Sequence, residues 1–145
     1  MNNRFLSEKT LGKLVTWLRI LGFDTVYDTN KAETRIRLTR TEWVAKTLQN
    51  ERIIFIISND PVEQLRQVIE HLDIAEEDIR PFSRCLQCNT RTEEIEKDVV
   101  KSRVPDYIWE IHDRFRACRR CEKIYWPGSH TARSLNKIRK LFAES

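Results

Sequence analysis

The sequence has few of the residues that break regular structure, and it has no long apolar segment. Its 145 residues include only 3 glycines and 4 prolines, while 40% are hydrophobic and 33% are charged. This composition excludes fibrous and disordered proteins and favours a soluble globular domain. The longest apolar run is the five residues Ile53–Ile57, far short of the about 20 that a membrane helix needs. We therefore predict no membrane span.

The N-terminal segment also lacks the features of a secretory leader. Residues 1–5 contain no long apolar stretch and no small-residue cleavage site. We therefore expect a cytoplasmic protein. In that compartment the four cysteines are not expected to form disulfides.

Positive charge is unevenly distributed along the chain. Residues 1–80 carry 12 Lys or Arg and 13 Asp or Glu, whereas residues 81–145 carry 14 and 9. Nine basic residues and one acid lie within 114–140. A basic C-terminal half favours a polyanionic partner, with nucleic acid the leading candidate, although a solvated surface explains the charge equally well.

The character of the sequence changes near residue 80, which divides the chain into regions 1–80 and 81–145. The first region alternates apolar strands with amphipathic helices. The predicted strands are residues 4–6, 23–27, 35–38 and 53–57, and the predicted helices are residues 11–21, 42–50 and 61–72. This alternation predicts right-handed βαβ units and an α/β fold with a parallel sheet. Ligands of such sheets bind at the carboxyl ends of the strands.

Local signals mark the ends of two of these helices. Gly22 follows the last apolar residue of the first helix, where a left-handed cap ends it. Asp60 and Glu63 form a capping box around Pro61 at the start of the last helix. The run Ile53–Ile57 is apolar on both faces, which predicts a strand buried inside the sheet.

Two CxxC pairs give the strongest chemical signal. Cys85 and Cys88 are followed, after 29 residues, by Cys118 and Cys121. Each pair can turn two sulfurs toward one ion, and four thiolates suit tetrahedral structural zinc with no open position. The spacer exceeds the usual length of about 15–20 residues, which a longer insertion in a zinc ribbon would accommodate. Disulfides, a redox pair and an iron–sulfur cluster are the competing interpretations.

Several motifs, in order along the chain, resemble the Mut-seven C-terminal RNase family. They are Leu11-Gly12-Lys13-Leu14 with Trp17-Leu18-Arg19 and Gly22-Phe23-Asp24, Asp60-Pro61 with Glu63-Gln64-Leu65, Pro81-Phe82-Ser83-Arg84-Cys85, His112-Asp113 before Cys118, and Tyr125-Trp126 with Gly128-Ser129-His130. The resemblance covers nearly the whole chain. It implies a PIN-like α/β nuclease fold followed by a zinc ribbon, and it implies metal-dependent cleavage or processing of RNA.

The acidic site that this resemblance implies is altered here. PIN-like nucleases hold Mg²⁺ or Mn²⁺ with three or four carboxylates at the ends of parallel strands. In this chain Glu8 stands where the family has its first aspartate, and Thr41 stands where another is expected. Only nine residues separate Asp28 from Leu38, too few for the family's acidic helix and additional strand. We therefore expect a truncated PIN-like sheet with a weakened or lost metal site.

The candidate catalytic acids that remain are Glu8, Asp24 and Asp28, with Asp60 or Glu33 as further candidates. Asp60 also suits a helix cap, and Asp24 and Asp28 also suit the surface of a strand. Magnesium or manganese is implied only if this site functions. An active protein would then be a metal-dependent endoribonuclease.

The basic ribbon supplies the candidate RNA contacts, which are Arg116, Arg119, Arg120, Lys123 and His130. His112 and His130 either contact phosphate or transfer protons, or they lock the ribbon by hydrogen bonds. Five aromatic residues either form a stacking platform for single-stranded RNA or form the core of the ribbon. We expect most of these rings in the core and one or two exposed; they are Tyr107, Trp109, Phe115, Tyr125 and Trp126.

Three functions fit these features. The first is an RNA-processing or RNA-binding protein with a PIN-like nuclease site. The second is a noncatalytic RNA-binding module that has kept the fold and lost the metal site, which the missing acids favour. The third is an adaptor whose zinc ribbon binds an acidic protein, which the basic charge within 114–140 favours less than RNA.

Overall fold

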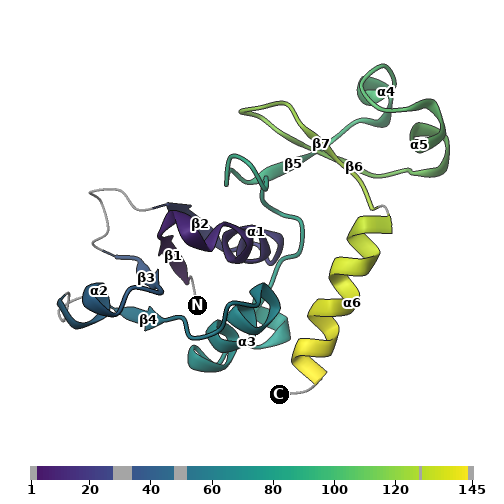
Figure 1. The fold of residues 1–145 in the computed structure, drawn as a ribbon. Helices are drawn as coiled ribbons and strands as arrows, with labels where there is room; N and C mark the ends of the chain where they lie inside the picture. The colour runs from purple at the N-terminus through teal and green to yellow at the C-terminus, as the bar shows by residue number, and fades with distance from the viewer. Residues whose placement is uncertain (1–2, 28–33, 48–51, 128, 144–145) are drawn as a thin grey trace.

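The computed structural model describes residues 3–27, 34–47, 52–127 and 129–143, without the side chains of 129–132. These residues form a four-stranded parallel sheet with helices, then a three-stranded antiparallel sheet, then a long helix (Figure 1). An α/β region with a parallel sheet, followed by a ribbon that carries the four cysteines, confirms the fold class predicted from the sequence.

The parallel sheet has the strand order β2-β1-β3-β4. Its elements are β1 (Arg4–Ser7), η1 (Lys9–Leu11), α1 (Gly12–Ile20), β2 (Asp24–Tyr27), β3 (Ile36–Thr39), α2 (Glu42–Thr47), β4 (Ile53–Phe55), α3 (Pro61–His71) and η2 (Glu76–Asp78). Parallel pairing places the carboxyl ends of these strands at one edge of the sheet. Glu8, which follows β1, therefore lies beside the residues that follow β3.

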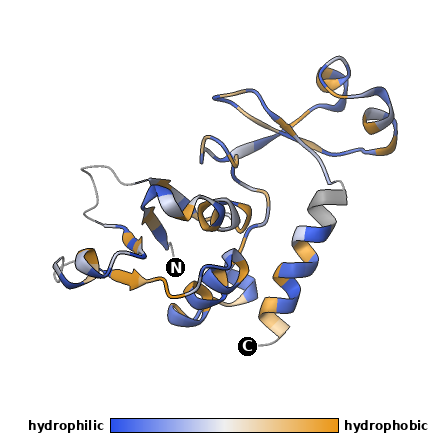
Figure 2. Ribbon diagram, viewed as in Figure 1, coloured by the Kyte–Doolittle hydropathy of each residue, from blue (hydrophilic) through white to orange (hydrophobic). Residues whose placement is uncertain are grey.

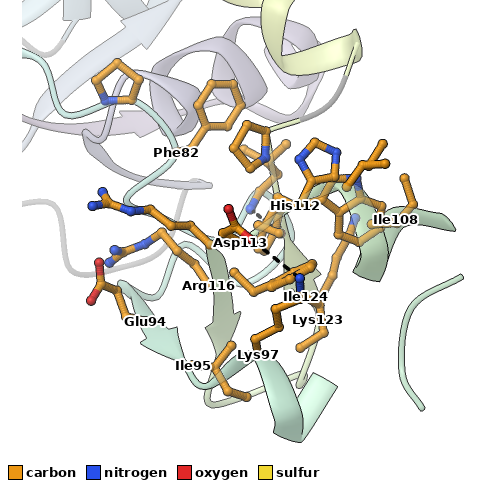
Figure 3. Close-up of a pocket in the computed structure, with 18 of the residues that line it drawn as sticks. Phe82, Glu94, Ile95, Lys97, Ile108, His112, Asp113, Arg116, Lys123 and Ile124 are labelled. Atoms are coloured by element: carbon orange, nitrogen blue, oxygen red, sulfur yellow. Dashed lines mark hydrogen bonds and ion pairs between the residues drawn. The ribbon is translucent and has the colours of Figure 1, made fainter. Parts of the chain in front are cut away.

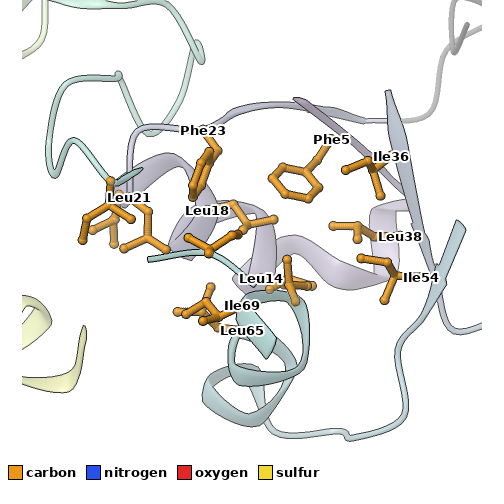
Figure 4. Close-up of a cluster of buried hydrophobic side chains, with 14 of the residues drawn as sticks. Phe5, Leu14, Leu18, Leu21, Phe23, Ile36, Leu38, Ile54, Leu65 and Ile69 are labelled. Atoms are coloured by element: carbon orange, nitrogen blue, oxygen red, sulfur yellow. The ribbon is translucent and has the colours of Figure 1, made fainter. Parts of the chain in front are cut away.

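One hydrophobic core lies between this sheet and helices α1 and α3 (Figure 4). Leu14, Leu18 and Leu65 are fully buried there, and each contributes about 1.5–3 kcal/mol by leaving water. The Phe5 ring meets the Phe23 ring edge-on at 5.7 Å. The helical spacing of leucines in the sequence is thus the spacing of buried positions.

Both predicted helix ends are confirmed, but the capping box is only half formed, because the Asp60 amide donates to the Ser58 hydroxyl and not to the Glu63 carboxylate. Gly22 follows α1 with φ 94°, and a Cβ at this position would lie 2.5 Å from the Arg80 carbonyl oxygen. Asp60 caps α3, because its carboxylate accepts a 3.1 Å hydrogen bond from the Glu63 amide, and Pro61 is the first residue of the helix. Gly22 thus permits both the left-handed turn and the close approach of the chain that leads to the cysteines.

The prediction that Ile53–Ile57 is buried inside the sheet is wrong. β4 is the edge strand of the described sheet. Ile54 and Ile56 are buried, whereas Phe55 is 39% and Ile57 is 74% exposed. Figure 2 shows the strand as apolar along its length, so its hydropathy does not reveal that one face is partly open to solvent.

The second sheet is antiparallel and has the strand order β5-β6-β7. Its elements are β5 (Thr92–Ile95), α4 (Lys97–Val100), α5 (Asp106–Ile111), β6 (Phe115–Cys118) and β7 (Ile124–Tyr125). Val100, Ile108 and Phe115 belong to a second core. The long spacer between the CxxC pairs is therefore an insertion whose helices supply the apolar surface that the short strands lack.

Helix α6 (Ser129–Ala143) leaves the ribbon and returns to the first core (Figure 1). Ile138 and Leu141 are buried in that core, and the Lys137 ammonium lies 5.9 Å from the centroid of the Trp17 ring. Of the helices that the structure describes, α6 is the longest, and none has both the length and the apolar composition needed to cross a bilayer.

The first cysteine pair is fastened to the parallel sheet by a polar network. The Asn89 side chain accepts a hydrogen bond from the Thr25 amide at 3.0 Å and donates one to the Asp24 carboxylate at 2.7 Å. The buried Arg19 guanidinium donates to the carbonyl oxygens of Thr25 and Leu86 at 2.9 and 2.8 Å. The segment that carries Cys85 and Cys88 is thus tied to both α1 and β2.

Asp24 is the charged member of this network. Its carboxylate accepts hydrogen bonds from the Arg35 guanidinium at 2.8 and 3.2 Å. Burial raises the pKa of Asp24, but the hydrogen bonds from Arg35 and Asn89 outweigh burial and hold this pKa below its usual value. A carboxylate with a depressed pKa stabilises the fold above its unfolded pKa of about 3.9. That contribution is lost as the pH falls through the folded pKa.

We expect Asp24→Asn to lower the free energy of unfolding by about 1–3 kcal/mol at neutral pH, because a carboxylate with several hydrogen bonds is replaced by an amide. The difference from the wild type should shrink below about pH 4, where Asp24 itself becomes protonated. Urea denaturation over a pH series measures both effects, with the exposed Glu70→Gln as control. An equal loss at all pH values would contradict a role for the charge.

Candidate functional site

The four cysteines converge on one point. The sulfur atoms of Cys85, Cys88, Cys118 and Cys121 all lie within 4.8 Å of one another, and those of Cys85 and Cys121 are 3.7 Å apart. Tetrahedral zinc, with Zn–S bonds of about 2.3 Å, would separate its sulfur ligands by about 3.8 Å. The predicted clustering is therefore confirmed, and the four side chains fit a closed tetrahedral metal site.

The two CxxC segments fold in the same way. In each, the amide of the first cysteine donates to the carbonyl five residues later, at 2.8 Å to Thr90 and 3.0 Å to Lys123. Its carbonyl accepts from the amide four residues later, at 2.9 Å from Asn89 and 2.8 Å from Glu122. Asn89 and Glu122 both adopt positive φ, at 64° and 62°. This repeated turn brings the two sulfurs of each pair to the same side.

None of the four cysteines forms a disulfide in the structure. A disulfide would require two sulfurs at about 2.05 Å, well below the 3.7 Å between Cys85 and Cys121. A redox pair uses two sulfurs and leaves the second pair unexplained. Convergence of all four favours the metal site over both of these alternatives.

Tyr125, on strand β7, forms a hydrogen bond with the sulfur atom of Cys85. Its hydroxyl donates to Cys85 Sγ at 3.1 Å and accepts from the Leu86 amide at 3.0 Å. Burial raises the pKa of Cys85, but hydrogen bonds from Tyr125 and nearby amides outweigh burial and lower this pKa to about 6. The Cys85 thiolate is therefore favoured at neutral pH, whereas the hydrogen bond with Cys121 raises the pKa of Cys88 to about 12. A bound cation would be needed to hold all four sulfurs as thiolates. From the sequence, Tyr125 is expected only as a core or stacking ring, since CxxC spacing carries no signal for this contact.

Glu8 lies at the carboxyl edge of the parallel sheet, directly after β1. Its carboxylate accepts hydrogen bonds from the Thr10 hydroxyl at 2.7 Å, from the Arg40 amide at 3.2 Å and from the Thr39 hydroxyl. Burial raises the pKa of Glu8, but these hydrogen bonds outweigh burial and hold the pKa below its usual value. Glu8 is thus an ionised group whose oxygens are already engaged by protein donors.

Thr41 stands beside Glu8 where the family resemblance implies an aspartate. Its hydroxyl lies 3.4 and 3.5 Å from the two Glu8 carboxylate oxygens. An acid at this position would face Glu8 and could share a cation with it, whereas threonine donates a hydrogen bond to it. Hydroxyl groups therefore stand around Glu8 where a nuclease metal site would have further carboxylates.

Asp24 does not join Glu8. It pairs with Arg4 at the start of β1, whereas Glu8 follows Ser7 at the other end of that strand. Glu8 is four residues beyond Arg4, about 13 Å along the strand, so the two carboxylates belong to opposite edges of the sheet. The structure instead gives Asp24 a structural role between Arg35 and Asn89.

The remaining candidate acids divide between those that the structure describes and those that it does not. Asp60 is exposed and caps α3, which confirms its helix-capping interpretation. Asp28 and Glu33 lie outside the described residues. Within the described ranges, the cysteine cluster is the only group of three or more His, Cys, Asp or Glu residues whose ligand atoms lie close enough together for one ion.

Two of the predicted RNA-binding arginines make contacts within the ribbon. The Arg116 guanidinium donates to the Thr92 hydroxyl at 2.8 Å and to the Thr92 carbonyl at 2.7 Å. Arg119 forms an exposed ion pair of 2.7 Å with Glu93. Exposed pairs contribute little stability and exchange partners readily, so Arg119 stays available to a ligand while Arg116 is fixed.

The other predicted RNA contacts are less constrained. Arg120 and Lys123 are exposed, and the Lys123 ammonium lies 5.5 Å from the centroid of the Tyr125 ring. The side chain of His130 lies outside the described part of the structure. Arg120 and Lys123 are thus exposed and form no ion pair with another described residue.

A cleft of about 1420 Å³ lies between the ribbon, the segment 81–86 and α6 (Figure 3). Strand register places Glu94, Arg116 and Tyr125 side by side on one face of the ribbon sheet, and all three line the cleft. Phe115 and Ile124 belong to the second core. The lining includes four basic side chains, which are Lys97, Arg114, Arg116 and Lys123. It also includes three acidic side chains, which are Glu94, Glu96 and Asp113.

His112 also lines this cleft and is half-buried. No hydrogen bond joins its ring to another described residue, so the structure gives it no locking role of the kind considered from the sequence. Among the five aromatic residues, Phe115 is buried, Tyr107 is 65% exposed, and the rest are half-buried. One exposed ring agrees with the prediction, whereas only Phe115 lies fully in the core, with Trp109 and Trp126 packed against it.

Comparison with known proteins agrees with this arrangement. The family model described as the Mut7-C RNAse domain matches residues 3–138. No curated protein and no solved structure gave a match. Because the family match runs through the parallel sheet, both cysteine pairs and most of α6, the chain belongs to the Mut7-C RNase domain family.

Proposed function

We propose that this chain binds RNA through its basic ribbon, that structural zinc holds the ribbon together, and that its metal-dependent nuclease site is weakened or lost. Membership of an RNase domain family supports RNA as the partner. The observation that carries the proposal is the set of hydroxyl and amide donors around Glu8, at the edge of the sheet where catalysis would need acids.

Zinc suits the cysteine cluster because all four ligands come from the protein. A site without an open position cannot bind a substrate atom, so its role is to stabilise the fold. The near-tetrahedral spacing of the Cys85 and Cys121 sulfurs and the repeated turn of the two pairs support this assignment.

Loss or weakening of cleavage follows from the demands of metal-dependent chemistry. Phosphodiester hydrolysis by paired ions requires carboxylates that hold them about 3.5–4 Å apart. At the carboxyl edge, Glu8 is engaged by threonines and Asp60 by the α3 amide. These two acids therefore offer a weak site for Mg²⁺ or Mn²⁺.

We expect one zinc ion per chain in protein purified without added metal. Cys118→Ser, or removal of zinc by a chelator, should unfold the C-terminal sheet, because metal binding is coupled to folding in such sites. Elemental analysis and circular dichroism measure the two results. Iron in place of zinc, or no metal at all, would contradict the assignment.

A milder variant tests the contact between Tyr125 and Cys85. Tyr125→Phe should retain zinc but bind it about 10–100-fold more weakly, the usual effect of removing a hydrogen bond to a ligand. Tyr107→Phe removes an exposed hydroxyl and serves as the matched control. Equal zinc affinity in both variants would show that Tyr125 does not support the site.

RNA affinity should fall steeply as salt concentration rises, because phosphate contacts release counterions. Replacing both Arg120 and Lys123 by Ala should weaken binding to all sequences alike and flatten the log–log salt slope by about 1.4, or about 0.7 for each lost contact with a single strand. The exposed Lys9→Ala, Lys46→Ala double variant is the control. Tight binding that does not depend on salt would contradict the proposed contacts.

Cleavage of generic single-stranded RNA in Mn²⁺ should be very low or absent. Thr41→Asp alone should not restore it, because one added carboxylate beside Glu8 does not replace the ligands of the missing family segment. The assay compares the wild type with Thr41→Asp, Glu8→Gln and the exposed control Glu77→Gln. Robust wild-type cleavage that Glu8→Gln abolishes and Glu77→Gln preserves would show that a working site exists.

A further inference from the structure

We infer that the cleft between the ribbon, the segment 81–86 and α6 binds the unpaired bases of single-stranded RNA, while its basic side chains contact the phosphates. This inference rests on the proposed RNA-binding function and adds a location and a strand type to it. At about 1420 Å³ the cleft is larger than the about 300–1,000 Å³ of pockets that enclose small ligands. It therefore suits a segment of polymer better than a single small molecule.

Two large side chains of α5 line the cleft and are exposed to solvent, so they do not serve to fill the second core. Tyr107 is 65% and Ile111 68% exposed, although both belong to α5 and line the cleft. They are four residues apart, so they share one side of the helix. An exposed aromatic ring beside an exposed apolar side chain can stack with any base, since every base presents a π-face.

The charges around this wall suit a phosphate backbone. Arg114 is exposed and Lys123 lies over the Tyr125 ring, so both can reach a ligand in the cleft. The nearby Asp113 carboxylate is 94% exposed and forms an ion pair of 3.4 Å with Lys97, which offsets part of its repulsion of a phosphate. The acids Glu94 and Glu96 lie at the end of β5 and would repel phosphates there, which favours a path along α5 and β7.

The combination favours single-stranded RNA over the alternatives. The bases of a duplex are stacked on one another, so they are not available to Tyr107. An acidic peptide would satisfy Arg114 and Lys123, but only some of its side chains could pack on the Tyr107 ring, whereas every base of a single strand can stack on it. The cleft thus offers both of the interactions by which proteins bind single strands, which are base stacking and phosphate contact.

The test measures fluorescence anisotropy with the zinc-loaded full chain and a labelled 12-nucleotide RNA, single-stranded or annealed to its complement. Tyr107→Ala should weaken single-strand binding about 5- to 100-fold, the loss expected when one base loses its stacking partner. The salt slope should stay unchanged, since no phosphate contact is removed. Tyr107→Phe, which keeps the ring, should bind like the wild type, and so should Trp43→Ala, which removes a ring that is 71% exposed on α2 outside the cleft.

Each other outcome identifies which idea fails. Unchanged binding in Tyr107→Ala, together with a loss in an Arg119→Ala, Arg120→Ala variant whose two side chains lie outside the cleft lining, would overturn the cleft and leave the proposed function standing. Equal affinity for the duplex would overturn the single-strand assignment. Displacement of the RNA by polyglutamate at equal concentration would overturn it in favour of an acidic protein. Absence of RNA binding by the wild type at low salt would overturn the proposed function itself.

Discussion

The convergence of four thiols on one point is the contact on which both parts of the molecule depend. The Cys85–Cys88 pair is fastened to α1 and β2 by Arg19 and Asn89, whereas the Cys118–Cys121 pair belongs to the ribbon hairpin. A metal bound by all four sulfurs would therefore close the ribbon and also join it to the parallel sheet. Neighbouring thiolates repel one another, so a cation is what allows four of them to meet.

Two acids of the parallel sheet, Asp24 and Glu8, form stabilising hydrogen bonds at its two opposite edges. At the amino edge, Asp24 joins Arg35 to Asn89 and so helps to seat the first cysteine pair. At the carboxyl edge, Glu8 ties the end of β1 to Thr39 and Thr41 of the neighbouring chain segment. Among the described acids, Glu8 and Asp24 thus stabilise the sheet through hydrogen bonds that occupy their carboxylate oxygens. We place RNA recognition instead on the ribbon, where arginine and aromatic side chains meet.

Local sequence rules predicted much of this fold, because they describe contacts within a few residues. The spacing of leucines predicted the helices, Gly22 and Asp60 predicted two of the helix ends, and the CxxC spacing predicted the cluster of sulfur atoms. What the sequence could not reveal depends on strand order and on contacts between distant segments. The run Ile53–Ile57 was predicted to be a buried strand because hydropathy does not show that β4 is the edge strand of the parallel sheet. The roles of Asp24 and Tyr125 depend on partners 65 and 40 residues away.

Hydrogen exchange at the Thr25 amide, with and without zinc, tests most directly whether the cysteine cluster holds the two parts together. This amide donates to the Asn89 side chain, whereas the Ile56 amide donates to Thr39 within the sheet and far from the cysteines. Removal of zinc by a chelator should abolish the protection of Thr25 together with that of Cys118, and it should spare Ile56. Retained protection of Thr25 after the Cys118 amide has become exposed would contradict this account.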